Sequence, residues 1–326
     1  MSERGGGAGV IPYLALAGLA FVWGLSFFFI KVAVGGGAMS PAALVLIRVG
    51  SATLTLAAVF AVTRRDPMPA TVRRSLSGLF WMAVFSTVIP FMLIAWGELS
   101  VTSGTASILN ATTPLWTAVL AYRAVPAERP TRLNYAGVAV GFAGTAVLVA
   151  PDLARHGLSG TTLGMLAVTG GAASYAVGAI LQRRRLAGVP VLEASLWQAL
   201  LATCLIIPFA VPTLPHARLS AGPLLAALAL GVGGTAVAYI LYYYLLNTLG
   251  ATRASAVTFL LPVTAVIWGA ALLHEVVTVF VLAGMAVILG GVFLTTRRGS
   301  RQSRPWERGA RPGPLDESAG GRLGGR

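Results

Sequence analysis

The segment ILNATTPLWTAVL, residues Ile108–Leu120, has a second copy in altered form further along the chain. The copy is Ala256–Trp268, which reads AVTFLLPVTAVIW. Each is an apolar run with a single proline, and Pro114 and Pro262 lie at an offset of 148 residues. Membrane helices tolerate such a proline where neighbouring helices and hydroxyl side chains satisfy the backbone groups that it frees. The two segments therefore predict two copies of one membrane-embedded unit, each with a helix-breaking proline.

Matching residues at nearly the same offset extend this correspondence over most of the chain. The pairs are Ser107 with Ser255, Glu128 with Glu275, Gly137 with Gly284, and, near the start of each half, Trp23 with Tyr175 and Lys31 with Arg183. Bundles of broken apolar helices that are doubled within one chain are typical of secondary transporters. We therefore predict two five-helix repeats, residues 1–150 and residues 151–296.

The composition indicates an all-α membrane protein. Apolar residues make up 56% of the chain and charged residues only 10%, and the mean hydropathy is +0.79. Soluble domains carry about 25% charged residues, whereas a membrane-spanning helix needs about 20 apolar residues. Ten transmembrane helices are predicted, at about residues 11–34, 41–63, 75–96, 101–121, 132–150, 161–182, 191–211, 222–246, 252–273 and 277–296.

The distribution of basic residues predicts the orientation of the chain. Lys and Arg collect on the cytoplasmic side of short membrane loops. If the N-terminus is cytoplasmic, 20 of the 24 Lys and Arg residues lie in cytoplasmic segments, and the opposite loops hold only Arg155 and Arg218. Both termini are therefore expected in the cytoplasm of a cell whose plasma or inner membrane the chain crosses. Five spans per repeat then make the second repeat inverted relative to the first.

The end of the chain differs in composition from the rest. Residues 297–326 are polar and rich in Gly, Arg and Pro, which predicts a disordered basic cytoplasmic tail. The net charge of +14 does not indicate nucleic-acid binding, because the charges are spread along one membrane side instead of clustering on a soluble face.

Motifs of enzymes and metal sites are missing from the sequence. It contains no H-E-x-x-H or G-x-S-x-G motif and no pair of acids at Mg²⁺-binding spacing. We therefore expect no enzyme, no cofactor and no metal ion. The expected partners are the lipid bilayer and a small-molecule substrate. The motif Gly137-x-x-x-Gly141 leaves a homodimer open, although such a motif also packs helices within one chain.

Two basic residues within the predicted spans are candidates for a substrate path, because charges inside a membrane are costly. Arg48 can either snorkel to the outer surface or face a cavity, where it would pair with Glu98 or with an anionic substrate group. Lys31 lies close to the outer end of the first span and presents the same alternatives, snorkelling or facing a cavity.

Polar and aromatic residues at membrane depth complete the predicted path. Trp23 and Ser26 share one helix face, and Asn110 and Thr113 belong to a polar stripe on the fourth span. The remaining candidates are Tyr175, Gln198, Tyr239 and Tyr243. Transport cavities combine aromatic walls with a few polar groups, but aromatic residues at this depth can equally well fill the core.

The order of these features resembles that of the EamA-type permeases in the drug/metabolite transporter superfamily. The resemblance covers about residues 11–296 and rests on the opening FVWGLSFFFIKVA (Phe21–Ala33), the two proline-containing segments, and the Glu-then-Gly patterns that begin at Glu128 and Glu275. Tyr175 departs from the family pattern, which has tryptophan there. The resemblance implies a permease that moves a small metabolite, often outward.

The favoured function is therefore alternating-access export of an amino acid or of an aromatic or amphipathic compound. An importer or exchanger of an anionic metabolite that uses Lys31 and Arg48 is the first alternative. A channel is disfavoured because channels usually surround a filter with identical subunits. A non-transporting membrane scaffold is the alternative from a different functional class.

Overall fold

The structure, a computed structural model, describes residues 10–63, 66–124, 131–186, 188–249, 254 and 256–296. In these residues all regular elements are helices. Eight helical segments there are long and apolar enough to cross a membrane, and shorter helices accompany them. The chain is thus an all-helical membrane protein. The predictions for Glu128 and for residues 297–326 lie outside the described residues.

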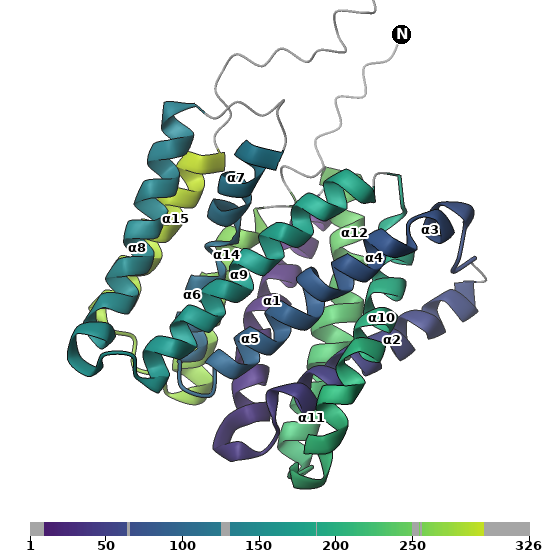
Figure 1. The fold of residues 1–326 in the computed structure, drawn as a ribbon, viewed down its shortest axis with the longest axis horizontal. Helices are drawn as coiled ribbons and strands as arrows, with labels where there is room; N and C mark the ends of the chain where they lie inside the picture. The colour runs from purple at the N-terminus through teal and green to yellow at the C-terminus, as the bar shows by residue number, and fades with distance from the viewer. Residues whose placement is uncertain are drawn as a thin grey trace, which may run out of the picture. The chain divides into compact units, whose positions relative to one another are not determined.

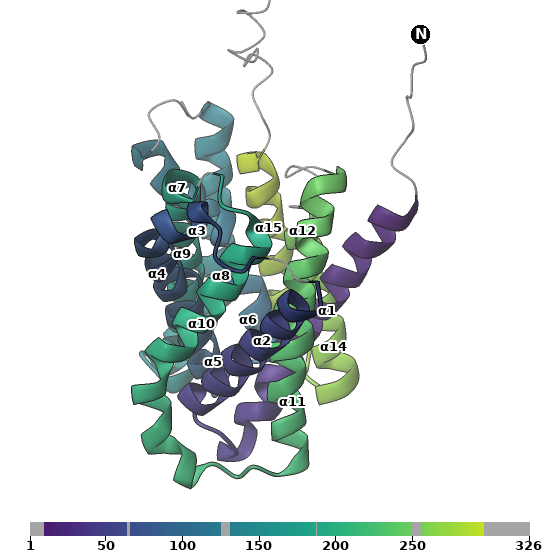
Figure 2. The same ribbon diagram turned by 90° about the vertical axis from the view of Figure 1, so that its right-hand side faces the viewer.

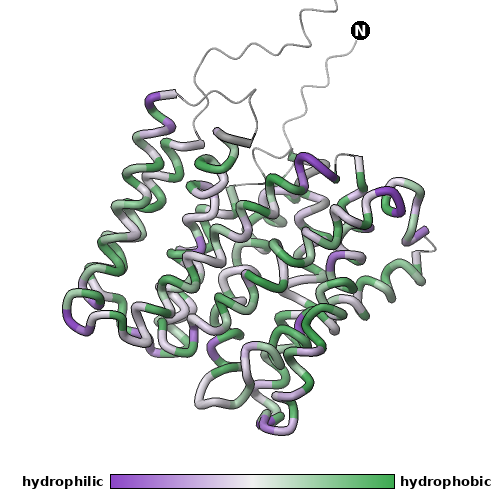
Figure 3. The backbone as a smooth tube through the Cα atoms, viewed as in Figure 1, coloured by the Kyte–Doolittle hydropathy of each residue, from purple (hydrophilic) through white to green (hydrophobic). Residues whose placement is uncertain are grey.

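The long segments follow one another with short connections. They comprise α1 (Val10–Val34) with η1 (Gly35–Gly37), α2 (Pro41–Thr63), α4 (Leu76–Ala83) with η2 (Val84–Val88) and α5 (Ile89–Gly97), α8 (Arg132–His156), α9 (Gly160–Arg185), α10 (Val191–Ala210) with η3 (Val211–His216), α11 (Ala221–Gly231) with η4 (Val232–Val237) and α12 (Ala238–Leu249), and α15 (Val279–Thr296). The shorter helices are α3 (Ala70–Arg74), α6 (Ser103–Asn110), α7 (Thr113–Ala124) and α14 (Val257–Leu273). Hydrophilic residues gather at the helix ends, and apolar residues fill the helix middles (Figure 3).

The two proline-containing segments differ in structure. The helix breaks between α6 and α7, and Pro114 is the second residue of α7. In the first turn of a helix the backbone N–H that proline lacks would have no partner within the helix, so proline is tolerated there. The expected break at Pro262 is absent, because α14 runs unbroken from Val257 to Leu273. Pro262 lies within two turns of the start of α14, so the helix loses one backbone hydrogen bond close to its end.

Two π-helical turns interrupt long helices at equivalent positions. η2 begins at Val84 and η4 begins at Val232, which is the same offset of 148 that relates the two prolines. π-helical turns are rare and are frequently found at functional sites. In η2 the carbonyl of Phe85 accepts a hydrogen bond of 2.8 Å from Ser174 of α9. A neighbouring helix thus satisfies a backbone group of the turn, as the membrane interior requires.

Glycines bring α8 and α15 together, and these helices lie side by side (Figure 1). A Cβ atom on Gly137 would lie 2.6 Å from the backbone nitrogen of Thr295, and a Cβ atom on Gly284 would meet the side chain of Leu148. Gly284 and Leu148 are the equivalents of Gly137 and Thr295 at an offset of 147. The same contact therefore occurs twice with the halves exchanged.

Other contacts repeat in the same way. Gly178 of α9 packs against Ser86 of η2, and Ser26 of α1 packs against Gly234 of η4. The helices α2 and α10 also pack against each other (Figure 2). There the hydroxyls of Thr53 and Thr203, at an offset of 150, lie 3.2 Å apart. These exchanged contacts are consistent with a repeat of two halves.

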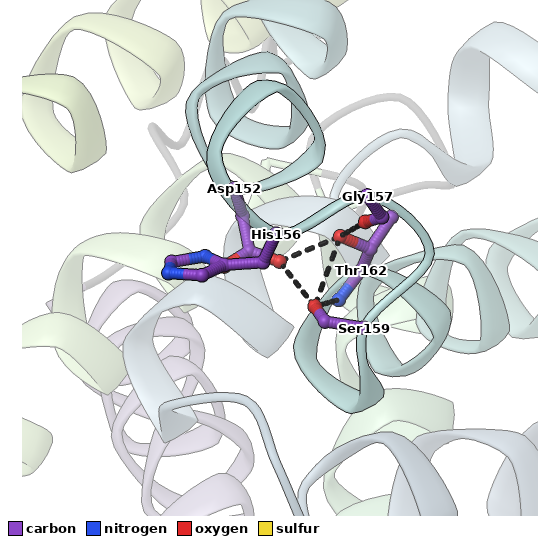
Figure 4. Close-up of polar contacts among 5 residues, drawn as sticks. All are labelled: Asp152, His156, Gly157, Ser159 and Thr162. Atoms are coloured by element: carbon purple, nitrogen blue, oxygen red, sulfur yellow. Dashed lines mark hydrogen bonds and ion pairs between the residues drawn. The ribbon is translucent and has the colours of Figure 1, made fainter.

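A hydrogen-bonded cluster lies at the connection between α8 and α9 (Figure 4). The carboxylate of Asp152 contacts Nδ1 of His156 at 3.0 Å and accepts hydrogen bonds from the hydroxyls of Ser159 and Thr162 at 2.8 and 2.6 Å. The Ser159 hydroxyl also accepts a hydrogen bond from the Thr162 backbone, which caps the start of α9. The cluster fixes the chain reversal at Gly157, whose φ is 62°.

Candidate transport site at the π-helical turns

Each π-helical turn presents a buried threonine to a long polar side chain. In η4, Thr235 Oγ1 accepts a hydrogen bond of 3.1 Å from Arg48 Nε on α2. In η2, Thr87 Oγ1 accepts a hydrogen bond of 2.7 Å from Gln198 Nε2 on α10. Thr87 and Thr235 are related by the offset of 148, and Arg48 and Gln198 by an offset of 150. The two hydrogen bonds therefore join equivalent positions in the two halves.

The π turn orients Thr235 toward Arg48. The Thr235 hydroxyl donates a hydrogen bond of 3.0 Å to the carbonyl of Leu230, five residues earlier. Because its proton is used within the helix, a lone pair of the oxygen is left for the guanidinium. This arrangement holds Arg48 Nε in a fixed place inside the protein.

The guanidinium of Arg48 is packed against aromatic rings. Its central carbon lies 3.7 Å from the centroid of the Phe91 ring, the geometry of a cation–π contact. The Phe91 ring in turn meets Tyr175 edge-on at 6.5 Å between centroids. The phenol groups of Tyr175 and Tyr239 also act electrostatically on Arg48. The side chain is 9% exposed and faces the protein interior, so Arg48 does not snorkel.

Arg48 retains hydrogen-bonding capacity. An arginine side chain has five N–H donors. Within the described residues, the bond from Nε to Thr235 is the sole hydrogen bond that this side chain makes. The two Nη groups therefore remain able to hold a planar anion such as a carboxylate through two parallel hydrogen bonds. The aromatic side chains beside them suit an apolar body attached to that anion.

Lys31 has a different role from Arg48. Its ammonium group donates hydrogen bonds of 2.6 Å to the carbonyl of Glu98 and 2.8 Å to the carbonyl of Val101. These carbonyls belong to the connection between α5 and α6. Lys31 thus binds buried carbonyls at the C-terminal end of α5, where cations are stabilised, and it does not snorkel.

Trp23 and Ser26 are placed by packing. The Trp23 ring lies 5.7 Å from that of Tyr242, and both rings pack on the apolar cluster around Leu19 and Leu245. The Ser26 hydroxyl is buried and donates to the carbonyl of Val22 at 3.1 Å. Core filling, which the sequence left open, accounts for these contacts.

Asn110 and Thr113 lie at the break between α6 and α7. The Thr113 hydroxyl donates a hydrogen bond of 2.8 Å to the carbonyl of Asn110, which the break leaves without a helical partner. The Asn110 Oδ1 atom is buried and has no partner among the described residues. No contact in this part of the chain joins Asn110 to Arg48. The side chain of Tyr243 lies outside the description, although its backbone belongs to α12.

The structure thus brings together Arg48, Tyr175 and Tyr239 and puts Gln198 in the equivalent place of the other half. Sequence reasoning missed three members of the site, Thr87, Thr235 and Phe91. The two threonines could have been found, because they occupy matching positions at the offset of 148. Nothing in the sequence distinguishes Phe91 from the other aromatic residues of the bundle.

Comparison with known proteins identifies the family. The model of the EamA-like transporter family matches residues 10–150 and again residues 162–297. The chain belongs to the EamA-like transporter family. It is therefore a multi-pass membrane transporter with two EamA domains and not an enzyme.

Curated relatives of this EamA transporter match most of its length. A protein of Streptantibioticus cattleyicolor named "Probable terminal-alkyne amino-acid exporter" is 29% identical over 288 residues, which are 87% of this chain and 93% of that protein. An uncharacterized transporter of Archaeoglobus fulgidus is 26% identical over 88% of this chain and 99% of its own. The uncharacterized inner membrane transporter YedA of Escherichia coli K12 is 26% identical over 86% of this chain and 89% of its own.

A solved crystal structure shares the fold. It aligns with a TM-score of 0.56 and 20% sequence identity, covering 88% of this chain and 97% of the other. At this identity the likeness concerns the fold alone.

Proposed function

We propose that this EamA transporter exports a small metabolite, an amino acid or an aromatic or amphipathic compound with a carboxylate, from the cytoplasm by alternating access. The membrane is the plasma or inner membrane, and both chain termini are cytoplasmic. The relative named as an amino-acid exporter supports the substrate class, and the relative named as an inner membrane transporter supports the membrane. The export direction is supported by the family resemblance and by the name of the relative called an amino-acid exporter.

The exchanged contacts support a ten-helix inverted repeat, residues 1–150 and 151–296. The contact of Gly137 with Thr295 and that of Gly284 with Leu148 are equivalent. So are the hydrogen bonds from Arg48 to Thr235 and from Gln198 to Thr87. An inverted repeat has two nearly equivalent packings, one open to each side, which is the basis of alternating access.

The observation that carries the substrate class is the environment of Arg48. A buried guanidinium with two Nη groups free of protein partners in the described residues can bind a carboxylate. Phe91 and Tyr175 lie beside it and provide apolar surface for the rest of the molecule. Gln198, its equivalent, is uncharged, so the site has one cationic half and one neutral half.

The test uses purified protein in liposomes loaded with a uniformly ¹³C-labelled mixture of the standard amino acids. Unlabelled mixture outside should drive exchange of particular labelled compounds, measured by mass spectrometry. Arg48→Gln should abolish this exchange. Arg218→Gln, a change at an exposed loop arginine, is the matched control and should not alter it. Exchange that survives Arg48→Gln at the wild-type rate would contradict the assigned substrate class.

The alternatives make different predictions in cells. An importer or exchanger of an anionic metabolite would enrich the substrate inside cells that express the protein, whereas an exporter enriches it in the medium. Lys31 gives the importer less support than the sequence suggested, because its ammonium group is already bound to two backbone carbonyls. A non-transporting scaffold would give no flux in either assay. A homodimer remains a sequence-based expectation, testable by light scattering of the purified protein.

A further inference from the structure

The carboxyl group of Glu98 is buried without a partner. The residue directly follows the apolar segment Leu76–Gly97 and is 0% exposed. Neither of its carboxyl oxygens has a hydrogen-bond partner among the described residues. Burying an ionised carboxylate without hydrogen bonds is strongly unfavourable. Glu98 therefore needs either a proton or a rearrangement of its surroundings.

Three charged groups on other elements act electrostatically on Glu98. They are Lys31 on α1, Arg48 on α2 and Glu275 in the connection between α14 and α15. Lys31 is within electrostatic range, yet its ammonium group binds the backbone carbonyls of Glu98 and Val101 instead of the carboxyl group.

Glu275 is engaged elsewhere as well. Its carboxylate accepts hydrogen bonds from the backbone nitrogen and the hydroxyl of Ser103 at 2.8 and 2.9 Å and from the nitrogen of Gly104 at 3.2 Å. It thus occupies the N-terminal end of α6, where anions are stabilised. His274, with a φ of 53°, ends α14 and turns the chain toward this position.

The electrostatic balance favours the protonated form of Glu98. Burial raises the pKa of Glu98 well above its usual range, Lys31 opposes this rise, Glu275 adds to it, and Arg48 opposes it. The opposing cations do not compensate because neither donates a hydrogen bond to the carboxyl group.

We propose that Glu98 carries the proton of a proton–metabolite antiport cycle. The inference rests on the proposed function and specifies how that function is driven. In the described conformation the carboxyl group of Glu98 is neutral. In the conformation open to the cytoplasm its O–H bond breaks, the proton passes to water, and the electron pair stays on the carboxylate. In the conformation open to the outside, a proton from water restores the O–H bond.

Lys31 links this charge change to the helices. A carboxylate at Glu98 attracts the Lys31 ammonium group away from the carbonyls of Glu98 and Val101. These carbonyls and Glu98 itself lie in the α5–α6 connection, so the loss of a proton replaces two hydrogen bonds to backbone carbonyls with an ion pair to the Glu98 side chain. Deprotonation thereby changes how α1 is held to the α5–α6 connection.

Infrared spectroscopy of the reconstituted protein tests the protonation state without any substrate. At neutral pH the wild-type protein should show the C=O stretching band of a protonated carboxyl group, and Glu98→Gln should remove that band. Glu193→Gln is the matched control, because Glu193 is also buried and one of its carboxylate oxygens also lacks a partner in the described residues. It should leave the band in place. A band that persists in Glu98→Gln, or is missing in wild type, overturns the proposal.

Liposome transport tests the coupling. With the membrane potential held at zero and the interior more acidic by one pH unit, one proton per substrate sustains an accumulation of about tenfold. Wild type should accumulate labelled amino acids to about that ratio, and Glu98→Gln should give a ratio of about one while its equilibrium exchange continues. Glu98→Asp, which keeps the acid, should retain coupling.

The outcomes separate the two proposals. If wild type exchanges none of the labelled amino acids, the proposed substrate class fails, and the infrared result still decides the protonation of Glu98. If wild type exchanges them but Glu98→Gln still accumulates about tenfold, the Glu98 proposal fails and the substrate class stands. Accumulation driven only by an acidic exterior or by a sodium gradient also overturns the Glu98 proposal. Loss of exchange in a well-folded Glu98→Gln protein does so as well.

Discussion

At the scale of single residues, the two halves of this protein differ in charge at one pair of equivalent positions. Arg48 and Gln198 occupy equivalent positions and make equivalent hydrogen bonds to threonines of the π turns. Only Arg48 brings a cation, which is 9% exposed and lies 3.7 Å from the Phe91 ring. Under the proposed function, this asymmetry gives a substrate carboxylate one preferred partner in the protein.

Replacing Arg48 by lysine tests whether geometry or charge matters. Lysine keeps the charge but lacks the planar fork that binds a carboxylate with two hydrogen bonds. Hydrogen bonds to charged groups contribute about 1.5–3 kcal/mol, so Arg48→Lys should raise the apparent KM for exchange about tenfold or more. The measurement is concentration-dependent exchange in liposomes. An unchanged KM would show that the fork makes no contact with the substrate.

Removing a hydroxyl from a π turn should have different effects in the two halves. Thr235→Val leaves Arg48 Nε buried without its acceptor, so it should lower the free energy of unfolding and also reduce exchange. Thr87→Val leaves Gln198 Nε2 buried without its acceptor and should lower the free energy of unfolding by about 1–3 kcal/mol. Thermal unfolding in detergent and exchange in liposomes, measured on both variants, distinguish these effects. Equal loss of exchange in both variants would argue against a special role for Arg48.

At the scale of helices, close backbone contacts fix the pairing of α8 with α15. A Cβ atom on Gly291 would lie 2.7 Å from the carbonyl oxygen of Gly137, whereas a Cβ atom on the adjacent Gly290 would meet no atom within 4 Å. Two neighbouring glycines in one helix thus have opposite tolerances for a methyl group.

This difference gives a matched pair of variants. Gly291→Ala should destabilise the protein by about 1–3 kcal/mol, because the added methyl group forces the helix backbones apart. Gly290→Ala should be neutral or stabilising, because alanine favours a helix over glycine by about 1 kcal/mol. Thermal unfolding in detergent measures both. Equal melting temperatures for the two variants would contradict the described packing of α8 on α15.

The elements also show how far sequence reasoning reaches. The apolar runs predicted helices at 41–63 and 277–296, and α2 and α15 follow those bounds closely. The π turns could not be predicted from hydropathy, because a change in backbone hydrogen bonding leaves the apolar pattern unaltered. The predicted helix break at Pro262 was wrong, because a proline near the start of a helix removes only one backbone hydrogen bond and α14 continues past it.

The candidate site was predictable in part for a related reason. Arg48 and Gln198 stood out because polar groups are costly in a membrane. The direction in which each side chain points could not be predicted from its position along the sequence alone. Lys31 and Arg48 looked alike in sequence, yet one binds backbone carbonyls and the other packs on Phe91.

At the scale of the whole molecule, the proposed inverted topology makes a prediction about sidedness. α9 has 26 residues and spans about 39 Å at 1.5 Å per residue, enough to cross a hydrocarbon core of about 30 Å. Arg155 precedes this helix and Arg184 lies near its end, and both are exposed. The proposed orientation puts Arg155 outside the cell and Arg184 in the cytoplasm.

Cysteine labelling checks this orientation. With Cys204 replaced by serine, Arg155→Cys should react in intact cells with a thiol reagent that does not cross membranes. Arg184→Cys should react only after the cells are broken. The reverse pattern would invert the orientation, and with it the assignment of the solution from which Glu98 takes its proton.

The two π turns also bear on how the two halves of the protein arose. A rare backbone conformation stands at the same offset in both halves, and each copy carries a threonine that accepts a hydrogen bond. The same rarity at matching positions is what duplication of one half-length gene that already encoded the turn would produce. Under that duplication, position 48 and position 198 began as the same residue, and arginine and glutamine are their later divergence.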